Sequence, residues 1–253
     1  MAATDRRNAE QLFHDSQARE RSRDFFRKPA TLCFTDDEYL DHETWIRPAF
    51  QQLGNVRGMK ALDFGCGHGM AAVVLARAGA RVTAFDLSGG YIGEAHRRAF
   101  ANQVDIDFVQ ADGERLPFAD DSFDRIWGNA VLHHLDVEIA ARELHRVLCP
   151  GGLAVFCEPW GENALLNWAR GRLHYPGKQR TADESPLRAE HMRVLETIFP
   201  RVHSRGFQLL AMARRLIGSG RVSEGLDRCD QSLFTHFPGL QRYCRYILLT
   251  LRR

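Results

Sequence analysis

The sequence predicts an α/β fold in which a mostly parallel sheet carries helices on both of its faces. From residue 60 to residue 157, short apolar stretches alternate with helical patterns, and such alternation is typical of parallel βα units. A glycine-rich turn, Gly65-Cys66-Gly67-His68-Gly69, joins the first strand to its helix. Glycines in such a turn permit positive φ angles and a close approach of the backbone to a ligand. Together these observations predict a nucleotide-binding sheet.

The bulk composition excludes several classes of protein. The chain has 253 residues, 44% of them hydrophobic, and a formal net charge of +2, which is ordinary for one globular domain. So small a charge gives no electrostatic reason to expect nucleic acid as the main partner. No apolar run approaches the ~20 residues of a membrane span, and the polar N-terminus has no signal-peptide core. The six cysteines form no C-x-x-C pair, so we expect a cytoplasmic protein without a metal site.

The alternating region defines a core at residues 56–158. Strands are expected at 60–64, 81–85, 106–110, 123–127 and 153–157. Helices are expected between them at 70–77, 90–101 and 138–148. The carboxyl ends of parallel strands share one edge of the sheet, and ligands bind beyond that edge. The residues predicted to gather there are Asp63, Asp86, Asp112, Asn129 and Glu158.

The segments that flank this core have a different character. Residues 1–55 show helical apolar spacing over 8–26 and 36–53, and we interpret them as a lid over the ligand turn. Residues 159–253 are expected to form a substrate-side insertion followed by the last strands. Within them we expect helices at 163–172, 188–199 and 221–237 and strands at 202–210 and 243–251. No low-complexity linker separates the parts, so a single domain is expected.

The glycine spacing separates two classes of nucleotide ligand. A dinucleotide fingerprint reads G-x-G-x-x-G, whereas the turn here reads Gly65-x-Gly67-x-Gly69 and is preceded by Asp63. A pyrophosphate gains nothing from a nearby carboxylate, but a cationic amino-acid ligand gains a charge-assisted hydrogen bond. Both features count against the alternative of an NAD-dependent oxidoreductase.

Several ordered motifs resemble those of the class I S-adenosylmethionine-dependent methyltransferases, in particular the small-molecule, type 11-like subgroup. Residues 62–69 resemble the family's motif I, and Asp86 stands where its ribose-binding acid stands. Residues 111–118, 131–135 and 146–152 resemble later motifs. The resemblance, strong over 60–158, implies a Rossmann-like sheet of seven strands. It also implies S-adenosyl-L-methionine as cofactor and S-adenosyl-L-homocysteine as product.

The resemblance also implies a protein partner for each part of the cofactor. Asp63 would bind the ammonium, with helix capping as its alternative role. Asp86 would accept from both ribose hydroxyls, because one carboxylate has two oxygens for a vicinal diol. Leu87 would pack on the adenine, and Asp112 would accept from its amine. The remaining implied cofactor contacts are Phe64, Gly65, Gly67, Gly69, Gly113, Asn129 and Glu114, the last of which fits a solvated cap equally well.

Transfer to a hydroxyl or carbon acceptor requires a base. His133 and Glu158 are equal candidates from the ends of the fourth and fifth strands, and an unperturbed histidine pKa of ~6.5 suits the task. Candidate substrate contacts are Tyr39, Trp160 and Arg180. The aromatic residues favour an apolar or aromatic small molecule from secondary or isoprenoid and quinone-type metabolism, whereas the basic residues leave room for an acidic one.

Other classes of function stay open at this point. Intact Asp63, Asp86 and Asp112 support cofactor binding but do not establish turnover, so a non-catalytic cofactor-binding partner protein is an alternative. RNA or protein methylation is disfavoured by the near-neutral charge and by the absence of an Asn-Pro-Pro-Tyr-type motif after the fourth strand. The sequence is compatible with a monomer or a homodimer and does not identify the acceptor.

Overall fold

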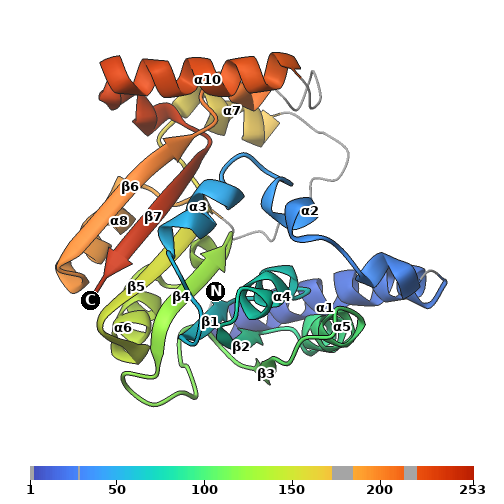
Figure 1. Ribbon diagram of the computed structural model, residues 1–253. Helices are drawn as coiled ribbons and strands as arrows, with labels where there is room; N and C mark the ends of the chain where they lie inside the picture. Colours follow the sequence, from blue (N-terminus) through green and yellow to red (C-terminus); the bar gives the residue numbers. More distant parts are fainter. Residues whose placement is uncertain (1–2, 28, 173–184, 214–220) are drawn as a thin grey trace.

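The computed structural model describes residues 3–27, 29–172, 185–213 and 221–253, and these contain a seven-stranded sheet (Figure 1). The strand order is β3-β2-β1-β4-β5-β7-β6. The strands are β1 Lys60–Phe64, β2 Arg81–Asp86, β3 Asp107–Gln110, β4 Phe123–Asn129, β5 Leu148–Pro159, β6 Arg201–Phe207 and β7 Tyr246–Arg252. Strand β7 runs antiparallel to both of its neighbours, and the other pairs are parallel. The predicted Rossmann-like, mostly parallel sheet of seven strands is therefore confirmed.

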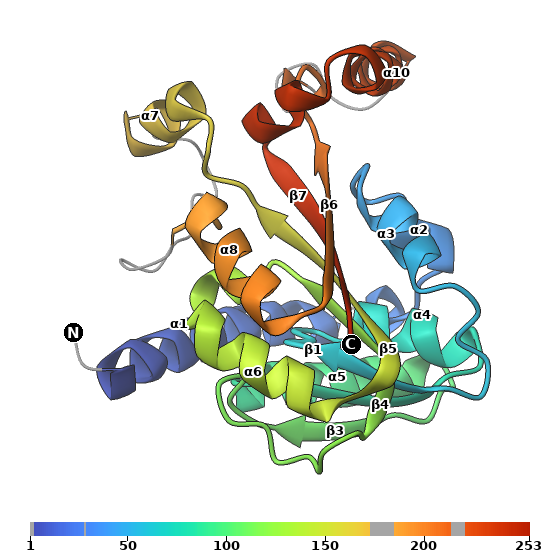
Figure 2. The same ribbon diagram turned by 90° about the vertical axis from the view of Figure 1, so that its left-hand side faces the viewer.

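Helices cover both faces of the sheet, as the alternating pattern predicts. One face carries α3 (Ile46–Gln52) and α4 (Met70–Arg77), and the other carries α6 (Val137–Val147) and α8 (Ala189–Ile198) (Figure 2). Helix α5 (Gly89–Ala101) packs on α4 and β2. The strand period of two sorts the side chains between these layers. In β1, Ala61 joins the core on the α4 side, whereas Leu62 and Phe64 join the core on the α6 side.

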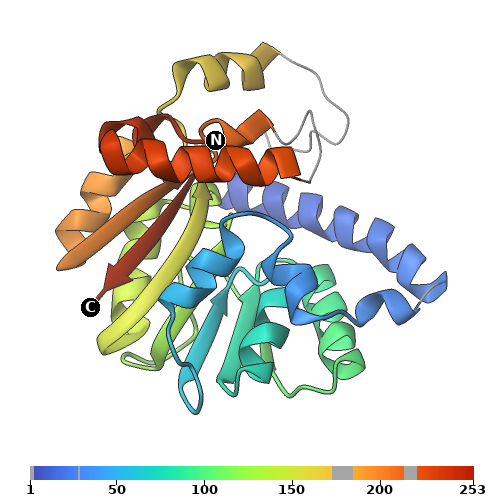
Figure 3. The same ribbon diagram turned by 45° about the horizontal axis from the view of Figure 1, so that its top comes forward.

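Three predicted helices lie outside these two layers. Helix α1 (Ala3–Arg27) packs against α5. Helices α7 (Ala164–Arg172) and α10 (Arg221–His236) lie at one end of the molecule, beyond the carboxyl ends of β5 and β6 (Figure 3). Among the described residues, no helix combines the length and apolarity needed to cross a membrane.

The predicted helix over 36–53 is two helices, α2 (Asp36–Leu40) and α3. A capping box between Thr35 and Glu38 starts α2. Pro48 lies in the first turn of α3, where its missing N–H does no harm, but a continuous helix would need that N–H. The aromatic spacing alone did not reveal this break.

Three strand boundaries also differ from those predicted by three residues or more. Strand β5 begins at Leu148 rather than 153, since the chain leaves α6 directly into pairing with Phe123. Strand β6 ends at Phe207 because Gln208 has a φ of 61°, which turns the chain out of the sheet. Strand β7 begins three residues late, because Pro238–Tyr243 form a 3-10 helix.

Candidate functional site

A cavity of about 260 Å³ lies at the carboxyl edge of β1, β2 and β4. The structure brings most of the predicted cofactor contacts into its lining: Asp63, Phe64, Gly65, Gly67, Asp86, Leu87, Asp112, Gly113 and Asn129. Gly69 and Glu114 are adjacent to the cavity but do not line it. Of the strand-end residues predicted to gather there, Asp63, Asp86, Asp112 and Asn129 line the cavity, whereas Glu158 does not.

The glycine turn needs its three glycines for different reasons. Gly65, Gly67 and Gly69 have φ angles of 67°, 51° and 80°, a region that L side chains rarely adopt. A Cβ on Gly65 would lie 2.4 Å from Val131 Cγ2, and one on Gly69 would lie 2.8 Å from Ala95 Cβ. A Cβ on Gly67 would meet no atom within 4 Å. Gly65 and Gly69 therefore serve close packing, whereas Gly67 leaves room beside the cavity.

Asp63 offers an unsatisfied carboxylate oxygen to the cavity. The residue is 2% exposed, and its Oδ2 has no hydrogen-bond partner among the described residues. Burial raises the pKa of Asp63 to about 7, against the opposing effect of a hydrogen bond from the Ala72 backbone. A buried carboxylate without a partner is costly. A cationic group in the cavity would satisfy this oxygen.

Asp86 is fixed by two backbone donors. Gly67 N donates to Oδ2 at 2.8 Å, and Ser88 N donates to Oδ1 at 2.9 Å. Burial raises the pKa of this carboxyl, while these two hydrogen bonds and the nearby His14 oppose the rise. Since each carboxylate oxygen can accept a further hydrogen bond, Asp86 is held in place and still able to bind a diol.

The acids predicted for the adenine end are paired with the N-terminal helix. Arg7 Nη1 donates to Asp112 Oδ2 at 2.5 Å, and Arg6 pairs with Glu114. Asp112 Oδ1 also accepts from Glu114 N at 2.9 Å. Helix α1 thus reaches the loop after β3, and Arg6 and Arg7 belong to the cavity lining.

Histidines that sequence reasoning did not select also surround the cavity. His14 of α1 lies 5.8 Å from His134 and 5.6 Å from Tyr91 between ring centroids. His14 Nδ1 has no hydrogen-bond partner among the residues that the structure describes. Burial lowers the pKa of His68, in the glycine turn, to about 3, so this ring is neutral. No motif marks His14, because helical spacing does not say what a helix will contact.

The two predicted bases form one buried pair. His133 Nδ1 lies 2.7 Å from Glu158 Oε2, and Glu158 Oε1 accepts from Val131 N at 3.0 Å and Leu132 N at 2.9 Å. Glu158 is 0% exposed. Neither residue lines the cavity, whereas His134 does. His134 Nδ1 lies 2.8 Å from Glu10 Oε1 of α1, so a second carboxylate–histidine pair stands in the cavity wall.

The three predicted substrate contacts have different locations. Tyr39 lines the cavity, and burial together with the charge of Asp63 raises the pKa of its phenol well above the ordinary value. Trp160 lies in the core on the α6 side and donates its Nε1–H to the Arg242 carbonyl at 3.0 Å. It is therefore outside the cavity lining. Arg180 lies outside the described residues.

Residues 62–156 match the family model of a methyltransferase domain. This segment is a methyltransferase domain. Demethylmenaquinone methyltransferase of Clavibacter sepedonicus is 38% identical over 117 residues, which are 46% of this chain and 47% of that protein. The malonyl-[acyl-carrier protein] O-methyltransferase of Pseudescherichia vulneris is 42% identical over 106 residues, 42% of this chain and 41% of that protein. The matches thus span less than half of each curated relative.

The methyltransferase domain also has counterparts among solved structures. An S-adenosylmethionine dependent methyltransferase from Mesorhizobium loti has a TM-score of 0.59 at 22% identity, over 85% of this chain and 100% of that chain. This likeness shows the fold alone, which is that of the class I methyltransferases. The family is one that binds S-adenosylmethionine or S-adenosylhomocysteine. The unpartnered Asp63 oxygen and the space beside Gly67 fit that cofactor.

Proposed function

We propose that the chain is an S-adenosyl-L-methionine-dependent methyltransferase with a small-molecule acceptor. One observation carries the proposal: Asp63, Asp86 and Asp112 line a single cavity at the carboxyl edge of a methyltransferase domain. These three acids lie at or just beyond the carboxyl ends of three different strands, and their spacing along the edge provides a separate partner for the ammonium, the ribose and the adenine of one cofactor.

The cofactor supplies an electrophilic methyl group on a sulfonium, and the protein supplies binding and orientation. Asp63 would hold the ammonium through its unpartnered Oδ2. Asp86 would accept from the ribose while the backbone N–H groups of Gly67 and Ser88 keep it in place. Asp112 would accept from the adenine amine, which would compete with Arg7 for Oδ2. Product S-adenosyl-L-homocysteine would use the same contacts.

A base for the acceptor is proposed among the two histidines after β4. Glu158 is engaged by the loop after β4, because its Oε1 accepts from Val131 N and Leu132 N and its Oε2 lies 2.7 Å from His133 Nδ1. It does not line the cavity. We assign Glu158 and His133 the task of positioning the loop after β4. His134 lines the cavity beside Glu10, so of the two histidines it is placed to take a proton from the acceptor.

The lid interpretation of residues 1–55 has support in the lining, because α1 contributes Arg6, Arg7, Glu10 and His14, and α2 contributes Tyr39. Much of the remaining wall is apolar, with Met70, Phe85, Trp127 and Leu135 among its members. This wall favours an apolar or aromatic acceptor of the secondary or isoprenoid and quinone-type classes, methylated at oxygen or carbon. The proposed protein acts in the cytoplasm as a monomer or homodimer, without nucleic acid.

An activity screen tests the proposal. The purified chain is incubated with methyl-labelled cofactor and fractionated metabolite pools, and transfer of label to a small molecule is followed. We expect labelled product that disappears in Asp86→Ala. Cofactor binding without any transfer would favour the non-catalytic binding protein instead, and failure to bind the cofactor would refute both.

A His134→Gln variant, compared with His133→Gln, tests the assignment of the base once an acceptor is known. If His134 is the base, His134→Gln lowers kcat by ~10²–10⁴-fold and removes the rise of kcat with pH. His133→Gln should retain that pH profile. A normal profile in His134→Gln would refute the assignment.

A further inference from the structure

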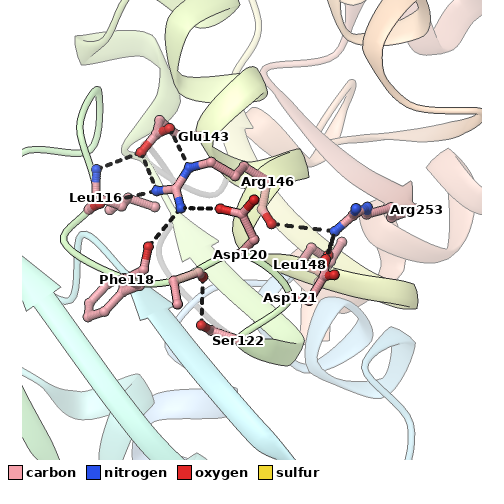
Figure 4. Close-up of polar contacts among 10 residues, drawn as sticks. Leu116, Phe118, Asp120, Asp121, Ser122, Glu143, Arg146, Leu148 and Arg253 are labelled. Carbon is pink, nitrogen blue, oxygen red and sulfur yellow. Dashed lines mark hydrogen bonds and ion pairs between the residues drawn. The ribbon is translucent and has the colours of Figure 1, made fainter.

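The loop between β3 and β4, residues 111–122, is held by helix α6 (Figure 4). This loop begins with Asp112, Gly113 and Glu114, the residues at the adenine end of the cavity. Beyond them it is bonded by two side chains of α6, Arg146 and Glu143. Arg146 itself does not line the cavity.

Arg146 uses all three guanidinium nitrogens. Nε and Nη2 donate to the two carboxylate oxygens of Glu143, both at 2.8 Å. Nη1 donates to Phe118 O at 2.7 Å and to Asp120 Oδ1 at 2.9 Å, and Nη2 donates to Leu116 O at 3.1 Å. A planar guanidinium can make such a set because its five donors are fixed in a fork, and a lysine cannot reproduce it.

Glu143 also bonds the loop, so Arg146 and Glu143 together form a clamp on it. Its Oε2 also accepts from Leu116 N at 2.8 Å, so the Arg146–Glu143 pair holds Leu116 by both its N–H and its carbonyl. Hydrogen bonds from Arg146 lower the pKa of Glu143, which keeps it ionised at neutral pH. The Leu116 side chain is buried in the core, so this point of the loop is fixed from several directions.

The clamp lies two residues after the adenine-end acids. Arg115 N donates to the Asp112 carbonyl at 3.0 Å, and Glu114 Oε1 accepts from Asp136 N, at the start of α6, at 2.7 Å. The N-cap residue of α6 therefore holds the loop at Glu114, and Glu143 and Arg146, farther along the helix, hold it at Leu116. Asp112 stands directly before these two anchors, so its position depends on them.

We propose that Arg146, acting with Glu143, is a positioning residue that places Asp112 for the adenine amine. The inference rests on the proposed cofactor-binding function. A hydrogen bond to the amine depends on short distance and good alignment, and a displaced acceptor loses it. Loosening the loop should therefore weaken recognition of the amine, while contacts at the ribose and the ammonium, which come from β1 and β2, stay in place.

The experiment compares two ligands by calorimetry: S-adenosylhomocysteine and S-inosylhomocysteine, in which a keto oxygen replaces the amine. The variants are Arg146→Met and, as matched control, Arg142→Met. Arg142 lies on the same helix and, within the described part of the chain, pairs only with exposed Glu138, in an i,i+4 contact at 2.7 Å. We expect Arg146→Met to lower affinity for the adenosyl ligand about tenfold with little change for the inosyl ligand. The control Arg142→Met should keep the wild-type ratio of adenosyl to inosyl affinity.

The outcomes separate the inference from the proposed function. Wild-type protein that binds neither ligand would refute the function. If wild type binds the ligands but Arg146→Met keeps the same ratio of adenosyl to inosyl affinity, the positioning role is overturned. This holds whether both affinities stay unchanged or both fall equally. If Arg146→Met fails to fold, Glu143→Gln and Arg146→Lys provide the test, because each retains part of the clamp. Both should lower the ratio by a smaller factor, and an unchanged ratio in both would also overturn the inference.

Discussion

At the scale of single residues, Asp63 is the group whose environment is most clearly tuned for a ligand. Burial raises the pKa of Asp63 to about 7, and its Oδ2 has no partner among the described residues, so this acid is partly protonated at neutral pH when no ligand is bound. A cationic ammonium binds the ionised form. Ligand binding at this position should therefore be linked to proton release.

This linkage predicts a pH dependence of S-adenosylhomocysteine binding. Below pH 7, affinity should fall by up to about tenfold per pH unit, since Asp63 must lose a proton before it can pair with the ammonium. Affinity should fall again only at more alkaline pH, because the carboxylate beside the ligand's ammonium raises the pKa of that ammonium above the ~7.7–8.0 of a peptide α-amino group. Calorimetry between pH 5.5 and 9 measures the acidic limb. In Asp63→Asn the acidic limb should vanish along with most of the affinity, and an acidic limb that persists would contradict the assignment.

The same group predicts a change in stability without ligand. The native pKa of Asp63, about 7, lies above the unfolded value of ~3.9, so the native state binds more protons between these values. Stability should therefore fall as pH rises from ~4 to ~7, by up to about 4 kcal/mol at higher pH. Urea unfolding of wild type and Asp63→Asn at pH 5 and pH 8 checks this. At pH 8 the free energy of unfolding of Asp63→Asn should be higher relative to that of wild type than at pH 5. A difference between the two proteins that does not depend on pH would disprove this prediction.

Substitutions in the glycine turn distinguish Gly67, which leaves room for a ligand, from Gly69, which serves close packing. Gly67→Ala incurs only the penalty for a left-handed backbone, roughly 1–2 kcal/mol. No clash is added, because a Cβ at this position meets nothing within 4 Å. Gly69→Ala adds a clash 2.8 Å from Ala95 Cβ, for a further 1–3 kcal/mol or so. We expect folded Gly67→Ala with greatly reduced cofactor binding, and a larger fall in melting temperature for Gly69→Ala. If the two variants are equally destabilised and Gly67→Ala binds the cofactor normally, this division of roles between Gly67 and Gly69 is contradicted.

At the scale of elements, α1 docks on the cofactor edge mainly through polar contacts. Besides Arg7–Asp112, its Asp15 accepts from Ser88 Oγ at 2.5 Å and from Gly90 N at 3.1 Å, and its Arg21 donates to Glu94. Leu12 of the same helix is 68% exposed. Since partly exposed ion pairs contribute little and are screened by salt, α1 is held by contacts that can be released.

The Arg7–Asp112 pair predicts competition with the cofactor. Arg7→Met should bind S-adenosylhomocysteine more tightly, by about tenfold, because the adenine amine no longer competes with a guanidinium for Oδ2. The gain should shrink at high salt, where the pair in wild type is weakened. Arg47→Met serves as the control, since Arg47 pairs with Asp37 and Asp41 away from the cavity. Weaker binding in Arg7→Met would instead mean that Arg7 contacts the ligand directly.

At the scale of the whole molecule, the sheet and its ligand edge could be predicted because each strand carries its own signal. Runs such as 60–64 and 81–86 are largely apolar and carry an acid, Asp63 or Asp86, at or next to their carboxyl end, and the parallel arrangement then brings those acids together. Boundaries were less predictable where a single dihedral decides them, as at Gln208, or where a proline splits a helical pattern, as at Pro48.

The contacts between distant segments could not be predicted. Helical spacing identified α1 but did not say that Arg7 would meet Asp112, a residue 105 positions later. Likewise His133 and Glu158 were each chosen from a strand end, but only the folded chain shows that they bond to each other and leave His134 in the cavity wall. Such pairings depend on where whole elements pack, which local patterns do not encode.

The cavity at the carboxyl edge should bind an S-adenosyl cofactor through its row of acids. A calorimetric titration of S-adenosylhomocysteine into wild type and Asp86→Ala measures this binding directly. We expect one site per chain in wild type and at least a hundredfold weaker binding in the variant, because the ribose loses a charged acceptor. No heat of binding to folded wild type, or equal affinity in Asp86→Ala, would contradict it.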